Sequence, residues 1–324
     1  MESVNRAIRR RGMFLRRRDL LRLGYTDRHI RYELGRRRIF RVRQGWYSIP
    51  DAPEPAVLAV RVGGRLTGVS ALESYGLRVP RRPQLHVAVP VGACRLRRPV
   101  DRSRRLTRQD PVRVHWVDSR TRGESAWRVT VADALLVVLT EEGREIAVAC
   151  ASAVMHHELL TSEQLGEVFS RAPARVAGWR CQVSDLDESH GETFARLWMT
   201  DAGIRFLQQV WANGARHDFR VGEHTYIEID GGQHDPAWNG GGASSWDSDF
   251  DRDTTVAIDG GATQRFNYRQ LYTDWPRVLQ AIRRLEADDA VLSAYRRRHP
   301  YRPRVHRKRR RSAAKTDTPA SESR

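Results

Sequence analysis

Apolar and polar side chains alternate along two short segments that flank a polar turn. Phe219 and Val221 precede the turn at 222–224, and Ile227 and Ile229 follow it. Alternation with a period of two on both sides of a glycine-containing turn predicts two antiparallel strands joined as a hairpin.

Carboxylates interrupt the apolar pattern of this predicted hairpin. If the turn is centred on Glu223, residues equally far from it face each other, so Asp218 lies opposite Glu228 and Arg216 lies opposite Asp230. Opposed side chains are about 5 Å apart at Cβ, where two like charges repel unless a cation neutralises them. The alternative interpretation is an edge hairpin whose carboxylates point into water.

Further periodic segments surround the hairpin. The patterns predict, in order, a helix over 189–203, a strand over 204–211, the hairpin, a helix over 246–261, a strand over 263–268 and a helix over 275–285. In the first helix Phe194, Leu197 and Trp198 share one face. Together these elements predict a compact α/β unit of about 100 residues, an order that suits an endonuclease core.

The N-terminal pattern is of a different kind. It predicts a helix over 14–23 that stops at Gly24, a second helix with Thr26 as N-cap and Ile30 and Leu34 as its buried stripe, and a hairpin over 39–49. This order predicts a winged helix-turn-helix that offers its second helix to a major groove of DNA and its hairpin to the backbone. The candidate DNA contacts are Arg28, Arg31, Tyr32, Arg36, Arg41 and Arg43.

Between these two parts the pattern predicts an α+β middle region without visible chemistry. Short apolar strands are expected at 57–62, 85–90 and 112–117, and a helical segment from 129 to about 170. The adjacent His156 and His157 resemble a metal pair, but neighbouring side chains on a helix point about 100° apart. A surface or packing role is therefore expected for them.

Length and charge indicate a modular protein that contacts a polyanion. The chain has 324 residues, 40% of them hydrophobic, which is enough for two or three cores. Its net charge of +18 comes from residues 1–50 (+11) and 295–324 (+10), and the rest carries −3. Basic ends favour binding to double-stranded DNA, although 55 of the 57 basic residues are arginine, as codon bias alone would produce. The basic tail at 295–324 is expected to be disordered.

Localisation follows from what the sequence lacks. Its start, MESVNRAIRRRG, has no apolar signal-peptide core, and no apolar run approaches the roughly 18 residues of a membrane span. The three cysteines, Cys94, Cys150 and Cys181, form no CxxC pair. We therefore expect a cytoplasmic protein with no membrane partner.

The N-terminal segment resembles a known DNA-binding domain. Residues 14–49, with the DLLRLG helix end and the RxRQGWY hairpin, are similar to the winged-helix domain of AbiEi-family antitoxins. The resemblance implies DNA binding and a cognate toxin or defence-system protein as a partner.

The C-terminal segment resembles a nuclease family. The ordered motifs are Glu192, HDF at 217–219, IEIDGGQH at 227–234, Asp249-x-x-Arg252-Asp253 and GGATQRF at 260–266. They are similar to DUF559 domains, of the Vsr-like branch of the PD-(D/E)XK superfamily. The resemblance implies a restriction-endonuclease-like α/β/α domain in which Asp218 and Glu228 are metal ligands and Glu192 is the helix carboxylate.

Metal-dependent phosphodiester hydrolysis accounts for such a set. Mg²⁺ or Mn²⁺ held by Asp218, Glu228 and the Ile229 carbonyl would activate water and neutralise phosphate charge, with Glu192 acting directly or through metal-bound water. The alternative for Glu192 is structural, because Ser189-x-x-Glu192 also spells a helix capping box.

One position departs from the superfamily pattern. Asp230 stands two residues after Glu228, where the superfamily usually has lysine, and no lysine precedes Lys308. Asp230 follows the DUF559 pattern, so the water-orienting group is expected elsewhere. The candidates are Gln233, His234 and Arg252. His234 could instead cap the strand end, and Arg252 could pair with Asp249 or Asp253.

The sequence thus predicts a multidomain α/β protein. Its expected parts are the winged helix-turn-helix (1–50), the middle region (51–184), the nuclease-like domain (185–294) and the basic tail (295–324). The expected function is a metal-dependent DNA endonuclease in bacterial defence, mobile elements or repair. The alternatives are a non-catalytic, antitoxin-like DNA-binding regulator and a nuclease that acts on RNA.

Overall fold

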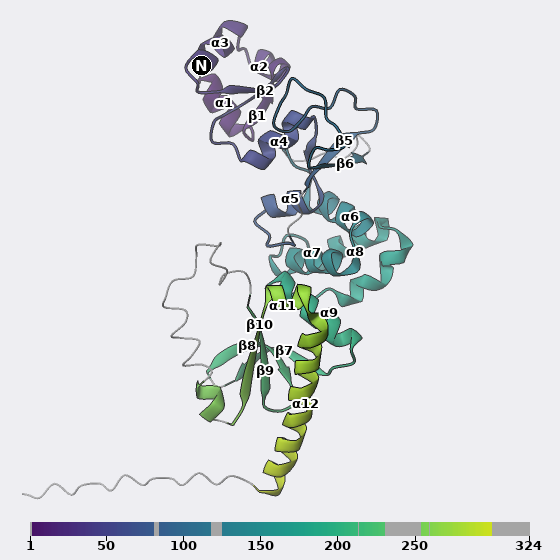
Figure 1. Cartoon of the computed structure of the whole chain (residues 1–324). Helices are drawn as coiled ribbons and strands as arrows, with labels where there is room; N and C mark the ends of the chain where they lie inside the picture. The colour runs from purple at the N-terminus through teal and green to yellow at the C-terminus, as the bar shows by residue number, and fades with distance from the viewer. Residues whose placement is uncertain are drawn as a thin grey trace, which may run out of the picture.

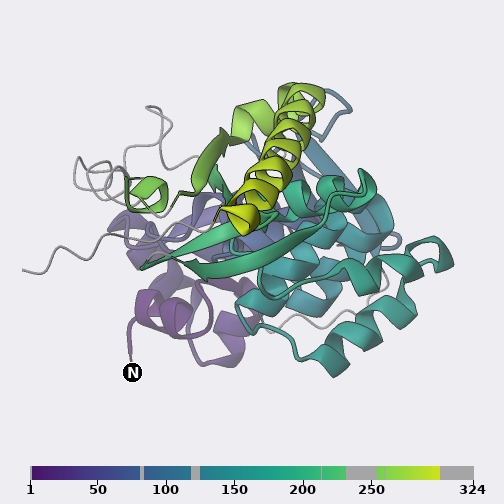
Figure 2. The same cartoon turned by 90° about the horizontal axis from the view of Figure 1, so that it is seen from below.

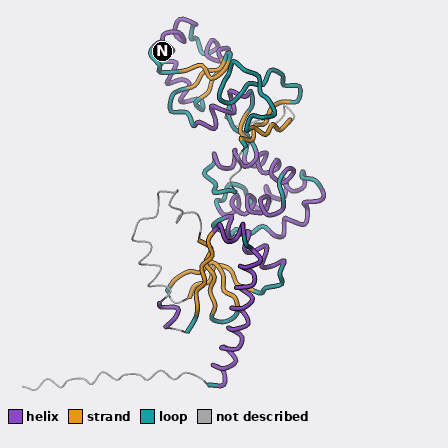
Figure 3. The backbone as a smooth tube through the Cα atoms, in the orientation of Figure 1, coloured by secondary structure: helices purple, strands orange, loops and turns teal. Residues whose placement is uncertain are grey.

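The computed structural model describes residues 2–80, 84–117, 125–212, 214–230, 254–258 and 260–299. These residues form a mixed α/β structure with sheets of three, three and four strands. In Figure 3 the strands gather in three places along the molecule, and a helical layer separates the second sheet from the third. No helix within these ranges has both the length and the apolar character to cross a membrane.

The N-terminal region builds a small helical layer on the first sheet. Its elements are α1 (Val4–Arg10), β1 (Phe14–Arg16), α2 (Arg17–Arg22), α3 (Asp27–Gly35), β2 (Phe40–Arg43) and β3 (Trp46–Ser48), with strand order β1-β3-β2. The N-cap of the second predicted helix is confirmed, because the Thr26 hydroxyl accepts from the His29 N–H at 3.4 Å. The predicted helix over 14–23 is wrong in its first turn. Fully buried Phe14 instead pairs with Ser48 as part of a strand.

The described residues of the middle region combine a second sheet with five α-helices and one 3₁₀ helix. Its elements are α4 (Glu54–Val62), β4 (Arg65–Leu66), α5 (Gly68–Ser74), β5 (Leu85–Pro90), β6 (Val112–Val117), α6 (Val131–Glu141), α7 (Arg144–His156), α8 (Ser162–Arg171) and the 3₁₀ helix η1 (Ala174–Gln182). The sheet has the order β4-β5-β6, with β5 parallel to β6. The predicted strands at 85–90 and 112–117 and the helical segment to about 170 are confirmed.

The strand predicted at 57–62 is wrong, because these residues belong to helix α4. Pro55 lies in the first turn, where proline favours a helix start, and Ala56, Ala59 and Val60 are buried at helical spacing. Further along, His156 Nδ1 lies 2.8 Å from the Asp185 carbonyl, which agrees with the packing role expected for it.

The C-terminal region holds the four-stranded sheet that carries the candidate site (Figure 1). Its elements are α9 (His190–Asp201), β7 (Phe206–Ala212), β8 (Ala215–Val221), β9 (Thr225–Asp230), β10 (Ala262–Asn267), α11 (Tyr268–Thr273) and α12 (Trp275–Arg298). The order is β10-β9-β8-β7, with β9 and β10 parallel and the other pairs antiparallel. The predicted first helix, the hairpin and the strands on either side of it are confirmed.

The last helix is longer than predicted. α12 continues to Arg298, so residues 295–298 of the expected disordered tail are helical, and residues 300–324 lie outside the described ranges. Figures 1 and 2 show α12 lying across the four-stranded sheet. Its Val278 and Ile282 join one hydrophobic core with Phe219 and Ile227 of the hairpin and Met199 of α9.

The β8–β9 turn is fastened to α12 by one buried carboxylate. Asp289 is 5% exposed and accepts hydrogen bonds from the N–H groups of Glu223 (2.7 Å) and His224 (2.8 Å) and from the Thr225 hydroxyl (3.2 Å). Gly222 has φ +73° there, and a Cβ on it would lie 2.2 Å from the Asp289 carboxylate. The sequence therefore needs glycine at this position, and α12 fixes the hairpin that carries the candidate residues.

Candidate functional site

The hairpin has the register expected from its sequence. Phe219 pairs with Ile227 and Val221 with Thr225, which confirms a turn centred on Glu223. Beyond Phe219, the N–H of Ile229 donates to Oδ2 of Asp218 at 2.7 Å. Asp218 is therefore held by the strand that carries Glu228.

Glu228 is buried and is held by a histidine. The residue is 6% exposed, and its Oε1 lies 2.7 Å from Nδ1 of the fully buried His217. The His217 ring also packs against Tyr226, with centroids 4.3 Å apart. Within the described ranges Nε2 of His217 has no hydrogen-bond partner. His217 belongs to the HDF motif at 217–219, but the sequence alone predicts no role for it.

Glu192 reaches the same place from the first turn of α9. The Ser189 hydroxyl accepts from the Glu192 N–H at 3.1 Å, which confirms Ser189 as the helix cap. The Glu192 carboxylate does not close a capping box on the Ser189 N–H. It accepts instead from the Glu188 N–H at 3.0 Å and from Nε2 of Gln209 at 2.9 Å. The structural alternative for Glu192 is therefore only half correct.

Gln209 is a second residue of the site for which the sequence alone predicts no role. It has φ +51° in the middle of β7, a left-handed conformation that costs a non-glycine residue about 1 kcal/mol or more. The paired residues on either side, Gln208 with Phe219 and Val210 with His217, place it beside Asp218. The local strain thus coincides with the side chain that holds Glu192.

The three carboxylates interact electrostatically. Burial, followed by the negative charge of Asp218, raises the pKa of Glu192 to about 8. Burial, followed by the negative charge of Glu228, raises the pKa of Asp218 to about 7. Near neutral pH the cluster therefore retains protons that separate carboxylates in water would have lost.

These shifts predict a specific dependence of stability on pH. Because the folded pKa values of Glu192 and Asp218 are raised, their contribution to stability is fully present below the unfolded values near 4 and is lost as pH rises through about 7 to 8. We expect the Tm of the cation-free protein to fall more steeply between about pH 5 and pH 8.5 than that of Glu192→Gln. Parallel curves in differential scanning calorimetry would contradict this origin of the shifts.

The donor set fits a cation that keeps part of its water shell. Oδ1 of Asp218 and Oε2 of Glu228 make no hydrogen bond within the described ranges. The same ranges contain no preassembled group of three or more His, Cys, Asp or Glu side chains suited to a metal ion. Mg²⁺ commonly binds through one or two carboxylates and several waters, so these two oxygens fit it better than a metal that requires an all-protein cage. Ile229, whose carbonyl is the third predicted ligand, is the residue whose N–H holds Asp218.

Arg265 of β10 is a candidate for the positive charge that a lysine usually provides in the superfamily. Arg265 is the strand partner of Glu228, and its Nη1 lies 3.7 Å from Asp230. The predicted position of Arg216 opposite Asp230 is not observed, because the paired residues of β8 and β9 end at Phe219 and Ile227. The Arg216 side chain forms an ion pair with Glu188. The other candidates, Gln233, His234 and Arg252, lie outside the described residues together with Asp249 and Asp253.

The candidate DNA contacts lie where the sequence analysis expected them, with one exception. Arg28, Arg31 and Tyr32 are exposed on α3, Arg36 is exposed directly after its last residue, and Arg41 is exposed on β2. Arg43 is half-buried, and its Nη1 would lie 2.2 Å from a Cβ added at Gly63. This burial lowers the pKa of the Arg43 guanidinium. Arg43 therefore packs against Gly63 of the middle region, and its contact with DNA stays a prediction.

Comparisons with known proteins add little to this geometry. No protein-family model matches the chain, and no curated protein matches it. Among solved structures it is similar to the RV2827C protein from Mycobacterium tuberculosis, at 14% sequence identity and a TM-score of 0.31, over 60% of this chain and 79% of the other. A TM-score this low carries no argument, so the resemblances to DUF559 and AbiEi remain predictions from sequence.

Proposed function

We propose that the chain is a divalent-metal-dependent DNA endonuclease with a restriction-endonuclease-like core. The observation that carries the proposal is the convergence of Glu192, Asp218 and Glu228 from α9, β8 and β9. The pKa values of Glu192 and Asp218 are raised by burial and by the negative charge of a neighbouring carboxylate, Asp218 in the first case and Glu228 in the second. Clustered, buried carboxylates repel one another unless a cation or protons neutralise them, and binding a cation is a common function of such a cluster.

Each side chain has a definite task under this proposal. Asp218 and Glu228 bind Mg²⁺ or Mn²⁺, which when bound supplies an activated water and neutralises phosphate charge. His217 positions the Glu228 carboxylate through its 2.7 Å hydrogen bond. Glu192 exchanges a proton with water near the scissile phosphate. Arg265 takes over the positive charge that the superfamily lysine provides elsewhere.

We also propose that the N-terminal region is a winged helix that brings the nuclease to duplex DNA. Two features support this: the element order α1-β1-α2-α3-β2-β3 and the exposed basic face of α3. The order matches a winged helix-turn-helix, in which the equivalent of α3 lies in the major groove. A cytoplasmic location, a role in defence, mobile elements or repair, and a toxin or defence-system partner belong to the same proposal.

Substitutions on α3 test the DNA-binding role. We expect Arg28→Ala and Arg31→Ala each to weaken duplex binding by about 1 to 3 kcal/mol where a base contact is lost. Arg284→Ala on α12, whose side chain is 77% exposed, is the matched control and should change affinity little. Fluorescence anisotropy at fixed salt measures the three affinities. Equal, small effects of all three substitutions would remove α3 from the interface.

A non-catalytic regulator is the second candidate. It is favoured by the absent lysine and by the lack of a preassembled three-ligand metal site among the described residues. In this alternative the sheet is a platform, and Glu192, Asp218 and Glu228 retain protons without binding a cation.

Incubation of the purified protein with nucleic acids distinguishes these candidates. Supercoiled plasmid, single-stranded DNA and RNA are each incubated with Mg²⁺, with Mn²⁺ and with EDTA. The endonuclease proposal requires nicked or linear plasmid that depends on the cation. An intact plasmid under all conditions, together with tight duplex binding, would favour the regulator, and cleavage of RNA alone would move the substrate class to RNA.

A further inference from the structure

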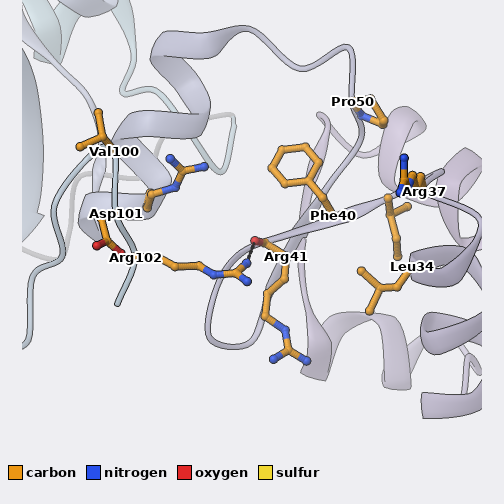
Figure 4. A pocket seen from close by; sticks show the side chains of 10 residues that line it. Leu34, Arg37, Phe40, Arg41, Pro50, Val100, Asp101 and Arg102 are labelled. Carbon is orange, nitrogen blue, oxygen red and sulfur yellow. Dashed lines mark hydrogen bonds between the residues drawn. The ribbon is translucent and has the colours of Figure 1, made fainter. Parts of the chain in front are cut away.

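A basic groove of about 880 Å³ lies between the N-terminal and middle regions, away from the carboxylate cluster. One wall comes from the end of α3 and the start of β2, and the other from α4 and the chain that follows β5. Figure 4 shows the Phe40 ring between these walls, with Arg37 on one side and Arg102 on the other. The residues that matter here are Arg37, Phe40, Arg41, Arg61, Val100 and Arg102.

The positive charge of the groove exceeds its negative charge, because four arginines and one carboxylate, that of Asp101, line it. Its four arginines form no ion pair within the described ranges, and Arg102 instead donates to the Arg41 carbonyl. The acidic lining residue Asp101 accepts from the N–H of Ser103 at 2.8 Å and from its hydroxyl. Nε of Arg61 is buried without an acceptor. Burial and the nearby charge of Arg102 lower the pKa of Arg61, and the smaller effect of Asp101 opposes them. The groove therefore favours an anionic ligand.

Backbone strain coincides with this charge. Arg37 has φ +54° directly after α3, in the left-handed region where glycine is favoured at a helix end. Its side chain makes no hydrogen bond or ion pair within the described ranges, so the structure offers no internal reason for arginine there. Binding of a ligand by the Arg37 side chain accounts for an arginine at a position whose left-handed backbone favours glycine.

The ligand is identified by the combination of arginines with an aromatic face. Proteins hold single-stranded nucleic acids in positively charged grooves in which aromatic rings stack on bases. We propose that this groove binds a short run of single-stranded DNA, with phosphates against Arg37, Arg61 and Arg102 and a base against Phe40. The groove adjoins α3, so the strand would be an unpaired continuation of the duplex bound there. The choice of DNA over RNA and the continuity with a duplex on α3 both rest on the proposed function, whereas binding of a single strand in the groove does not.

Two substitutions test the groove without disturbing the core. Phe40→Leu keeps an apolar side chain where Phe40 packs against the middle-region core, but removes the aromatic face. Arg37→Gly removes the charge and relieves the left-handed strain, so its Tm should equal or exceed that of the wild type. Arg108→Ala, an exposed arginine outside the groove lining, is the matched control.

The measurement is fluorescence anisotropy of full-length protein in EDTA, with labelled single-stranded DNA, RNA of the same sequence and blunt duplex. We expect Phe40→Leu to raise the Kd for single-stranded DNA at least about fivefold, while duplex affinity stays within about twofold. Arg37→Gly should reduce the slope of log K against log salt by about 0.7, the value for one lost phosphate contact on a single strand. Arg108→Ala should leave the Kd within about twofold.

Several results would overturn the proposal. Wild-type affinity and salt slope in both groove variants would mean that single strands bind elsewhere. Equal losses on duplex and single strand would assign the groove to the duplex, and tighter binding of RNA would reject DNA as the ligand. The binding assay contains no metal, so its result does not depend on cleavage. If the protein cleaves no nucleic acid but shows the expected binding differences, the proposed nuclease activity is wrong and the proposed single-strand site stands.

Discussion

Replacing Asp218 by asparagine is expected to remove cation-dependent DNA cleavage while leaving duplex binding unchanged within about twofold. The substitution deletes a negatively charged ligand, which costs several kcal/mol of transition-state stabilisation, or a loss of rate of roughly a thousandfold. Asparagine still offers Oδ1 to the Ile229 N–H, so the hairpin should remain intact. Stability without cation should hold or rise, because repulsion with Glu228 is removed.

Glu228→Gln should behave in the same way, and the same hairpin provides the control. Glu223 lies in the exposed turn and pairs with Arg297 of α12, away from the carboxylate cluster. Glu223→Gln should therefore cleave at the wild-type rate. Plasmid nicking and duplex binding are measured for all three variants. Wild-type cleavage by Asp218→Asn would show that the metal site has been assigned to the wrong residues.

The largest effect on stability is expected from Asp289→Ala on α12. The substitution leaves two part-buried backbone N–H groups and the buried Thr225 hydroxyl without their acceptor. Hydrogen bonds to a charged group contribute about 1.5 to 3 kcal/mol, and buried donors left unpaired add a further cost. We expect the free energy of unfolding to fall by about 3 kcal/mol.

The neighbouring residue supplies the control for this prediction. Asp288 is 56% exposed and pairs with Arg284 at the surface, so Asp288→Ala should change stability by less than about 0.5 kcal/mol. Both variants are measured by urea denaturation and compared through midpoint and slope. Equal midpoints for the two would contradict the view that Asp289 anchors the β8–β9 turn.

The hairpin could be predicted because its sequence carries local and periodic signals that agree. Gly222 marks the turn, the apolar residues alternate on both sides, and a slip of one residue would have exposed Ile227 and Ile229. The α3 helix was predictable for a similar reason, because Thr26 caps it and Ile30 lies on its buried face.

The errors have equally local causes. Residues 57–62 are apolar on several sides, so periodicity alone does not separate a buried strand from a buried helix, and the signal from Pro55 was overlooked. Phe14 joins a strand because Ser48, distant in sequence, is its partner. Such long-range pairing is absent from local patterns.

The residues that complete the candidate site could not be predicted either, because their roles depend on contacts between segments distant in sequence. Glu192 was found by resemblance, but its link to Gln209 depends on a left-handed residue in β7 that no composition signal marks. Arg265 lies beside Glu228 only because β10 pairs in parallel with β9. His217 gains its role from a hydrogen bond to the adjacent strand. These contacts follow from the tertiary arrangement of elements whose existence the sequence did predict.

Cation binding by the carboxylate cluster is the claim on which the proposed chemistry depends, and calorimetric titration of Mn²⁺ tests it most directly. At pH 7 in two buffers of different ionisation enthalpy, we expect the wild type to bind with release of protons, because the cation displaces protons retained at the raised pKa values of Glu192 and Asp218. Asp218→Asn should lose this binding, and Glu223→Gln should keep it. Absence of Mn²⁺ binding by the wild type, or equal binding by Asp218→Asn, would contradict the account.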